Sequence, residues 1–294
     1  MTRCGIVAFL GASNVGKSTL LNRLVGQKVS IVSPKVQTTR SKIKGIAVHD
    51  DTQLIFLDTP GIFTPHNRLE RAMVSAAWDE ALDADARLVV IDAQKADDNS
   101  REILQKLPAQ SAIVALNKID LVEKTALLPL IDSLKDLPAV SDIFCISAQT
   151  GENVDQLLQT LIQRMPQAPF MYPEDQISDL PQRLFAAEIT REKIFFLLRQ
   201  ELPYSIAVAT TAWEESNDTI RIEQTIFVER TGQKAIVIGK KGAMLSNIGS
   251  KARAAMTQAF GKKVHLFLLV KVKENWTDDP EHYKEWGLDF NAKN

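Results

Sequence analysis

The stretch GASNVGKS at residues 11–18 matches the pattern GxxxxGK(S/T). It follows an apolar run at residues 5–10 and opens a stretch of helical spacing that reaches residue 26. This pattern binds phosphate when it lies between a strand and a helix, because its glycines let backbone N–H groups surround the anion and the helix N-terminus favours negative charge. Lys17 would then reach the β and γ oxygens of a nucleotide, and Ser18 would ligate Mg²⁺.

Short apolar runs recur through the first half of the chain, separated by stretches with helical spacing. After residues 5–10, the runs are residues 46–48, 54–57, 88–91, 113–116 and 143–146. Strands that alternate with helices predict an α/β domain with a mostly parallel sheet. Residues 49–52 lie between two adjacent runs, which indicates one antiparallel hairpin within that sheet.

The length and the position of prolines predict two domains. At 294 residues, the chain is about twice the usual size of a single domain. Pro166, Pro169 and Pro173 follow a predicted helix and fall in a short segment whose composition suits a linker. We therefore predict a first domain at residues 1–166, a linker at 167–180 and a second domain at 181–294.

The composition and the cysteine content of the chain indicate its cellular compartment. The chain is 45% hydrophobic and 24% charged, and no window approaches the roughly 18 apolar residues that span a bilayer. Cys4 and Cys145 lie far apart and the chain has no CxxC pair, which argues against disulfides and against a zinc site. We therefore expect a cytoplasmic protein.

A carboxylate and a hydroxyl that could bind Mg²⁺ lie downstream of the phosphate loop. The DTPG motif begins at Asp58, directly after a predicted strand, where the carboxylate would hold Mg²⁺ through water and the Gly61 N–H would donate to a γ-phosphate. The QTTR motif at residues 37–40 lies in a stretch without clear periodicity, which indicates a mobile loop. We select Thr39 as the ligand that binds Mg²⁺ only when a γ-phosphate is present, and Thr38 is the alternative.

Two further segments after predicted strands indicate which base is bound. The NKID motif at residues 117–120 ends on Asp120, which can accept hydrogen bonds from the N1–H and 2-amino groups of guanine, whereas adenine offers no donors there. Ser147 and Ala148 would supply a backbone contact to the guanine oxygen. Together with the phosphate loop, these motifs predict a guanine-nucleotide site.

The second half predicts a smaller α+β domain that binds RNA. Its expected elements are a helix at 181–200, strands at 205–212, 220–229 and 235–238, a helix that ends near 260, and a strand at 264–272. The GKKG loop at residues 239–242 matches the GxxG loop by which KH domains clamp nucleotides. Residues 233–272 carry eight Lys or Arg and no Asp or Glu, which suits RNA, and we expect Ile238 and Ile248 to line the base groove.

These motifs, with SAQTGENV at residues 147–154 and IGKKGAMLSNIGSKAR at residues 238–253, resemble the Era family within the translation-factor class of GTPases. The resemblance covers essentially the whole chain. It implies a GTPase that uses Mg²⁺, a P-loop domain followed by a type II KH domain, and binding to the 3′ end of small-subunit (16S) rRNA during assembly and maturation of the 30S subunit. It also implies peripheral contact with the inner face of the cell membrane, and we expect a monomer.

Two positions affect the expected rate of GTP hydrolysis. Ile62 stands where Ras-like enzymes carry the glutamine that orients the attacking water, so we expect a slow intrinsic rate. Asn14 matches the asparagine that coordinates a potassium ion in related GTPases without that glutamine, so K⁺ stimulation is a hypothesis. The alternative is that Asn14 only caps the phosphate loop.

Two other functions fit the same residues: an RNA chaperone in which the nucleotide is structural, and a membrane-surface GTPase whose basic face binds anionic lipid.

The candidate catalytic residues are Lys17, Thr39 and Gly61, and the candidate Mg²⁺ ligands are Ser18, Thr39 and, through water, Asp58. The candidate GTP-binding residues are Gly11, Ala12, Ser13, Asn14, Val15, Gly16, Lys17, Ser18, Thr19, Asp58, Thr59, Pro60, Gly61, Ile62, Asn117, Lys118, Asp120, Ser147 and Ala148. The candidate RNA-binding residues are Ile238, Gly239, Lys240, Lys241, Gly242, Lys251 and Arg253.

Overall fold

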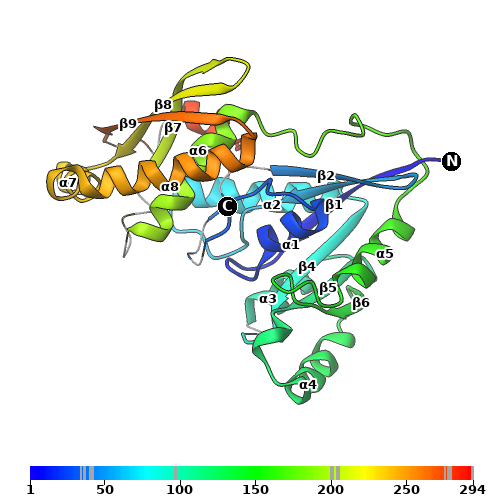
Figure 1. Ribbon diagram of the computed structural model, residues 1–294. Helices are drawn as coiled ribbons and strands as arrows, with labels where there is room; N and C mark the ends of the chain where they lie inside the picture. The colour runs from blue at the N-terminus through cyan, green and yellow to red at the C-terminus, as the bar shows by residue number, and fades with distance from the viewer. Residues whose placement is uncertain are drawn as a thin grey trace. The chain divides into compact units, whose positions relative to one another are not determined.

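The computed structural model describes residues 1–33, 35, 38–39, 43–95, 98–198, 202, 206–274, 276 and 280–292 (Figure 1). The chain divides into two compact units, and each is considered by itself. The first unit comprises Met1–Ser30, Val36–Asp179 and Glu281–Asn294, and the second comprises Ile31–Lys35 and Leu180–Pro280. Among the described residues, no helix is both long enough and apolar enough to cross a bilayer.

The first unit is built on a six-stranded sheet with the order β2-β3-β1-β4-β5-β6. The strands are β1 Arg3–Leu10, β2 Ile43–His49, β3 Thr52–Asp58, β4 Ala86–Asp92, β5 Ala112–Asn117 and β6 Val140–Cys145. Only the β2–β3 pair is antiparallel, and the other neighbours are parallel. The predicted α/β fold is therefore confirmed, including its single hairpin at residues 49–52. Because β1, β3, β4 and β5 run in the same direction, the loops that follow them meet at one edge of the sheet.

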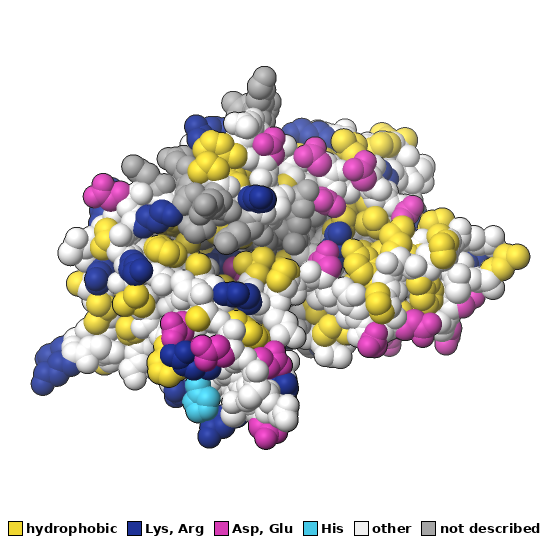
Figure 2. Space-filling model, turned by 90° about the horizontal axis from the view of Figure 1, so that it is seen from above, with side chains coloured by type: hydrophobic (Ala, Val, Ile, Leu, Met, Phe, Trp, Pro, Cys, Tyr) yellow, Lys and Arg dark blue, Asp and Glu magenta, His cyan; other side chains and the backbone are white. Residues whose placement is uncertain are grey.

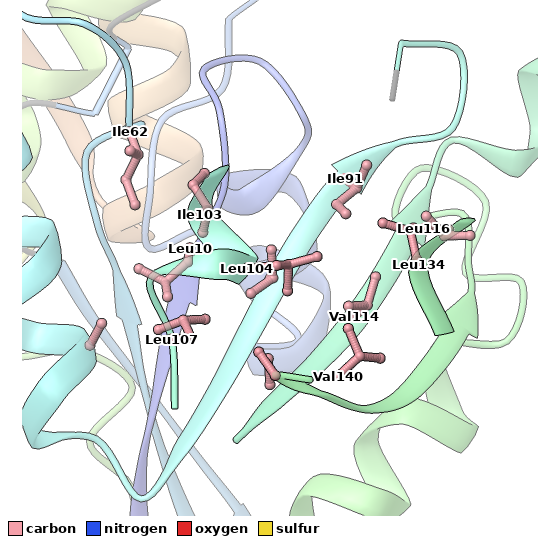
Figure 3. Close-up of a cluster of buried hydrophobic side chains, with 14 of the residues drawn as sticks. Leu10, Ile62, Ile91, Ile103, Leu104, Leu107, Val114, Leu116, Leu134 and Val140 are labelled. Atoms are coloured by element: carbon pink, nitrogen blue, oxygen red, sulfur yellow. The ribbon is translucent and has the colours of Figure 1, made fainter. Parts of the chain in front are cut away.

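Helices cover this sheet and enclose its core. They are α1 Lys17–Val25, α2 Arg68–Asp83, α3 Asp98–Gln105, α4 Lys124–Lys135 and α5 Val154–Arg164, with a short 3₁₀ turn η1 at Ile119–Leu121. In one core cluster, Leu10, Ile91 and Val114 of the strands pack with Ile103 of α3 and Leu134 of α4 (Figure 3). This packing fixes the strand ends from which the candidate site residues project.

The proline-containing segment predicted as a linker packs along the first unit up to Asp179. Isolated bridges pair Arg3 with Gln167 and Gly45 with Ser178. Phe170 and Tyr172 pack on a small cluster that includes Cys4. The C-terminal segment also belongs to the first unit, where the Phe290 ring makes an edge-to-face contact with Tyr283 at 5.0 Å between centroids and lies 4.5 Å from the Arg68 guanidinium.

The second unit has a three-stranded sheet with the order β7-β8-β9 and helices packed on one of its faces. Its elements are α6 Gln182–Leu197, β7 Ile206–Glu215, β8 Thr219–Val228, α7 Thr231–Ile238, η3 Lys240–Gly242, α8 Ala243–Phe260 and β9 Lys263–Val272. Helix α9, Pro280–Glu285, lies in the first unit from Glu281 onward. Strand β8 pairs antiparallel with β7 and parallel with β9. Within this unit the Val32 N–H donates to Glu192 Oε1 at 3.0 Å, which ties Val32 to α6.

Two predictions in the second half were wrong. Residues 235–238 form the last turn of α7 rather than a strand, because a four-residue apolar run does not distinguish a strand from a buried helix. The helix start is stabilised by Gln233 Oε1, which accepts hydrogen bonds from the N–H groups of Glu229 and Arg230. Ile248 is fully buried in the core of the unit, so its side chain does not line an exposed groove.

Candidate nucleotide-binding site

The phosphate loop joins β1 to α1 and adopts backbone conformations that require glycine. Gly11 has φ +141° and Gly16 has φ +102°. A Cβ at Gly11 would lie 2.3 Å from the Val90 carbonyl oxygen, and one at Gly16 would lie 2.2 Å from Asn117 Nδ2. Both positions therefore require glycine, because the backbone φ is positive and because a neighbouring atom lies too close to admit a Cβ. Asn14, between them, also has a positive φ of 69°.

Lys17 belongs to this motif, and its ammonium group donates hydrogen bonds to two backbone carbonyl groups of the loop. Its Nζ donates to Gly11 O at 3.0 Å and to Ala12 O at 2.9 Å. Burial lowers the pKa of Lys17 to about 8. Negatively charged phosphate oxygens beside the loop would favour the charged form again, because an opposite charge offsets the cost of desolvation.

Three hydroxyls converge on Asp58 at the end of β3. Asp58 Oδ2 accepts hydrogen bonds from Ser18 Oγ at 2.7 Å, Ser30 Oγ at 2.7 Å and Thr39 Oγ1 at 3.3 Å. Thr39 Oγ1 is also 3.1 Å from Ser18 Oγ, so the structure brings the selected threonine to the candidate metal ligands.

This oxygen cluster fits Mg²⁺. Asp58 Oδ1 is buried and has no hydrogen-bond partner among the described residues, and burial raises the pKa of the Asp58 carboxyl group. A divalent cation would supply the missing partner and keep the carboxylate ionised. Carboxylate and hydroxyl oxygens are the hard ligands that Mg²⁺ prefers. Gln37 and Arg40 of the same predicted loop lie outside the described residues.

The DTPG segment packs directly on the phosphate loop. Thr59 Oγ1 donates to Phe9 O at 2.5 Å, and the Ile62 N–H donates to Gly11 O at 3.0 Å. A Cβ at Gly61 would lie 2.5 Å from Ser13 Oγ, so the approach of the two loops requires a glycine there. The Ile62 side chain belongs to the buried core cluster and therefore takes no part in orienting water.

The two guanine segments are tied to the phosphate loop by Asn117 and Lys118. Asn117 Nδ2 donates to Val15 O at 2.8 Å, while its Oδ1 accepts from the Ala148 N–H at 2.8 Å. Lys118 Nζ donates to Asn14 O at 2.7 Å and pairs with Asp92 at 2.6 Å. Asp120 lies in η1 with an exposed side chain, which leaves its carboxylate accessible to a base.

The structure adds residues that the motifs did not indicate. A pocket of about 300 Å³ adjoins Ala148, and its lining residues are Thr19, Asn22, Arg23, Gly26, Gln27, Lys28, Ala148 and Gln149. Arg23 and Asn22 act through hydrogen bonds to backbone atoms, and such bonds leave no fixed sequence pattern. A polar residue on the last turn of a helix whose first turn binds phosphate is the only signal that could have drawn attention to them.

The GKKG loop of the second unit lies between α7 and α8. Gly239 has φ 71° and ψ 176°, and a Cβ there would lie 2.6 Å from Met244 Cβ. Lys240 and Lys241 are exposed on the loop, and Lys and Arg side chains are frequent on the left of Figure 2, the side that carries α7 and α8 in Figure 1.

Of the other predicted RNA-binding residues, Ile238 directly precedes this loop, whereas Lys251 and Arg253 lie in the middle of α8. Ile238 is half-buried at the end of α7, and Lys251 and Arg253 are exposed on α8. Because residues two apart on a helix do not face each other, only one of these two basic side chains can point to the same groove as the loop.

Family models match both units of the chain. A model described as a 50S ribosome-binding GTPase matches residues 6–118, and a model described as a KH domain matches residues 201–277. The GTPase Era of Bradyrhizobium sp. (strain ORS 278) is 53% identical over 293 residues, which cover 98% of this chain and 95% of that protein. The chain belongs to the Era family of GTPases. It is therefore an enzyme that hydrolyses GTP, with a KH domain after the GTPase domain.

Solved Era structures match the same fold along the chain. Era in complex with MgGDPNP and nucleotides 1506–1542 of 16S ribosomal RNA is 40% identical, with a TM-score of 0.91 and coverage of 98% of this chain and 99% of that one. A variant of Aquifex aeolicus Era bound to GDP·AlF₄⁻ is 41% identical, with a TM-score of 0.90 and coverage of 97% and 99%. Guanine nucleotide and Mg²⁺ are thus ligands of close structural relatives of this Era-family chain.

Proposed function

We propose that this chain binds GTP with Mg²⁺ in its first unit and the 3′ end of 16S rRNA through the GKKG loop, and acts in assembly and maturation of the 30S subunit. The observation that carries the RNA assignment is the exposed, acid-free GKKG loop between α7 and α8. The Era relative that contacts nucleotides 1506–1542 of 16S rRNA supports the identity of the RNA. The proposed domain boundaries are 1–166, 167–180 and 181–294, and the end of the chain from Glu281 packs with the first unit.

In the proposed nucleotide site, each residue has a role that follows from its position. Lys17 would turn from the carbonyls of the loop to the β and γ oxygens, and the Gly61 N–H would donate to the γ-phosphate. Ser18, Thr39 and, through water, Asp58 would hold Mg²⁺, which when bound offsets the negative charge of the phosphates. Because Ile62 is buried and cannot orient water, intrinsic hydrolysis is expected to be slow.

We propose a coupling between nucleotide and RNA. GTP would order the loops around Thr39 and Gly61, and the affinity of the second unit for RNA would change as a result. The measurement is fluorescence anisotropy of a labelled single-stranded RNA that ends like 16S rRNA, titrated with the full chain in the presence of a GTP analogue or GDP. Equal RNA affinities in the two states would contradict the coupling but would leave RNA binding itself intact.

The RNA site is tested by the double variant Lys240→Ala/Lys241→Asn. Asn suits position 241 because Lys241 has φ 52°, a conformation that Asn tolerates better than most residues. Loss of two phosphate contacts should reduce the slope of log affinity against log salt by about 1.4, since each single-strand contact contributes about 0.7. The measurement is the RNA affinity at a series of salt concentrations.

The matched control is Lys124→Ala/Lys135→Asn on the surface of α4, which should leave the slope unchanged. An unchanged slope in the loop variant would contradict the proposed RNA site, and stronger salt-sensitive binding to anionic vesicles than to RNA would assign the loop to a membrane surface. Gly239→Asp is a poorer test, because the Cβ at 2.6 Å from Met244 would disturb the start of α8 whether or not RNA binds there.

Potassium stimulation is a separate proposal, which rests on the family resemblance at Asn14. We expect GTP hydrolysis to be at least about tenfold faster in potassium than in sodium at equal ionic strength, because a cation beside the phosphates would stabilise the transition-state charge that an arginine finger stabilises elsewhere. Asn14→Gly, which tolerates the positive φ of 69° at this position, should remove this difference while retaining GDP binding. Equal rates of the unsubstituted protein in the two salts would leave Asn14 as a residue of the phosphate loop only.

A further inference from the structure

Arg23 joins the helix that follows the phosphate loop to the segment proposed to contact the base. Its Nε donates to Ala148 O at 2.6 Å, and its Nη2 donates to Gln149 O at 2.6 Å. The guanidinium also lies close to Gly151, where a Cβ would be 2.7 Å from Nη1 and where φ is +95°. The planar fork therefore lies against three residues of the loop after β6 and holds two consecutive carbonyl groups.

The pocket of about 300 Å³ lies beside these hydrogen bonds. Arg23 and Thr19 of α1 form one wall, and Ala148 and Gln149 form part of the other. The Arg23 hydrogen bonds therefore connect the two walls. A change in the length of these bonds would move the loop relative to the helix that begins at the phosphate loop.

The neighbouring residue on α1 fixes a further part of the lining. Asn22 Oδ1 accepts hydrogen bonds from the N–H groups of Val29 at 2.8 Å and Ser30 at 2.9 Å, and Asn22 Nδ2 donates to Ser30 O at 2.8 Å. These bonds secure the segment that follows Gly26, Gln27 and Lys28 of the pocket lining. The last turn of α1 thus anchors both segments that flank the pocket, with Arg23 on the side of the base-contacting loop.

We propose that Arg23 is a positioning residue for base recognition. By holding the carbonyl groups of Ala148 and Gln149, it fixes the position of the Ala148 N–H, which donates to Asn117 Oδ1 in this structure and would be shared with the oxygen at position 6 of guanine. The proposal rests on the assignment of residues 147–148 as the contact to that oxygen. Arg23 is exposed, so solvent weakens its bonds, and the expected effect on affinity is about tenfold rather than a complete loss.

The experiment compares three nucleotides that differ at single positions of the base. GDP carries the oxygen at position 6, 6-thioguanosine diphosphate replaces that oxygen with a weakly accepting sulfur, and inosine diphosphate lacks only the 2-amino group that would face Asp120. Their dissociation constants are measured by calorimetry for the full chain and for Arg23→Met, which keeps an unbranched side chain but removes the donors. Thermal unfolding of each variant checks that the nucleotide-free protein is folded.

We expect Arg23→Met to lower the affinity for GDP about tenfold and to lose most of the discrimination between GDP and 6-thioguanosine diphosphate. Its discrimination between GDP and inosine diphosphate should equal that of the unsubstituted protein, because the 2-amino group lies on the Asp120 side of the base. Arg23→Lys, with a donor that can still reach one carbonyl, should recover part of the lost affinity. Arg164→Met, which removes an arginine paired with Asp142 at the surface, should change none of these ratios.

An equal loss of affinity for all three nucleotides in Arg23→Met would overturn the proposal, because a residue that only stabilises the fold does not distinguish one atom of the base from another. Unchanged affinities would overturn it as well. If the unsubstituted protein did not discriminate between GDP and 6-thioguanosine diphosphate, the assignment of residues 147–148 would fail first. The two failures are therefore distinguishable.

Discussion

Asp120→Asn is expected to lower the affinity for GTP by at least about a thousandfold and to make xanthosine triphosphate the better substrate. The carboxylate of Asp120 can accept hydrogen bonds from both the N1–H and the 2-amino group of guanine. An asparagine amide presents one acceptor and one donor, so its NH₂ group would face the 2-amino group without a partner. Sites built on such polar pairs reject a mismatched ligand by about 10⁴-fold or more. Xanthine has an oxygen at position 2, which accepts from the new donor.

The measurement is hydrolysis of each nucleotide in competition with the other. Asp132→Asn, the same change at an exposed position of α4, should retain the guanine preference. The prediction is wrong if Asp120→Asn retains a preference for GTP within tenfold of the original, since the base would then be recognised by other groups of the loop.

Lys17→Met is expected to reduce both the affinity for GTP and the rate of hydrolysis, with a combined loss of roughly a hundredfold to ten-thousandfold. The estimate corresponds to two hydrogen bonds from a charged donor to the β and γ oxygens, each worth about 1.5–3 kcal/mol. The Met side chain fills similar space, so the phosphate loop should remain packed. Single-turnover hydrolysis and calorimetric titration with a GTP analogue measure the two effects separately.

Lys135→Met provides the matched control, because this exposed lysine on α4 pairs with the equally exposed Asp132 at 2.7 Å. Its hydrolysis rate should equal that of the unsubstituted protein. A Lys17→Met variant that hydrolyses GTP within threefold of the original rate would show that the ammonium group remains on the carbonyls of Gly11 and Ala12 when nucleotide is bound.

The motifs of the first unit were predictable because parallel strands end at one edge of their sheet. The motif at residues 11–18 follows β1, and Asp58 and Asn117 are the last residues of β3 and β5. Their proximity therefore follows from the strand pattern and from the direction of the chain. Arg23 and Asn22 could not be found in this way. Their side chains hold backbone atoms of distant loops, and almost any loop sequence supplies such atoms.

The second unit shows where hydrophobic patterns mislead. The run at residues 235–238 is apolar and β-branched in part, but it is too short to distinguish a strand from a helix turn, and the structure places it in α7. Ile248 lies on the inner side of α8 because the helix buries every third or fourth residue, including Ala252 and Met256. Apolar residues near a functional loop are thus not evidence of a groove unless the register of the helix is known.

Asn117 contacts both the phosphate loop and the base loop, and its position restricts which residues the chain can carry at positions 16 and 117. The amide nitrogen occupies the space where any side chain at position 16 would begin, 2.2 Å from the Cβ that Gly16 lacks. Positions 16 and 117, a hundred residues apart, are therefore constrained as a pair. A larger residue at 16 would be strained at φ +102° and would also require a smaller residue at 117. That second replacement would release Val15 and Ala148 together, so natural variants are expected to keep both residues or to lose nucleotide binding.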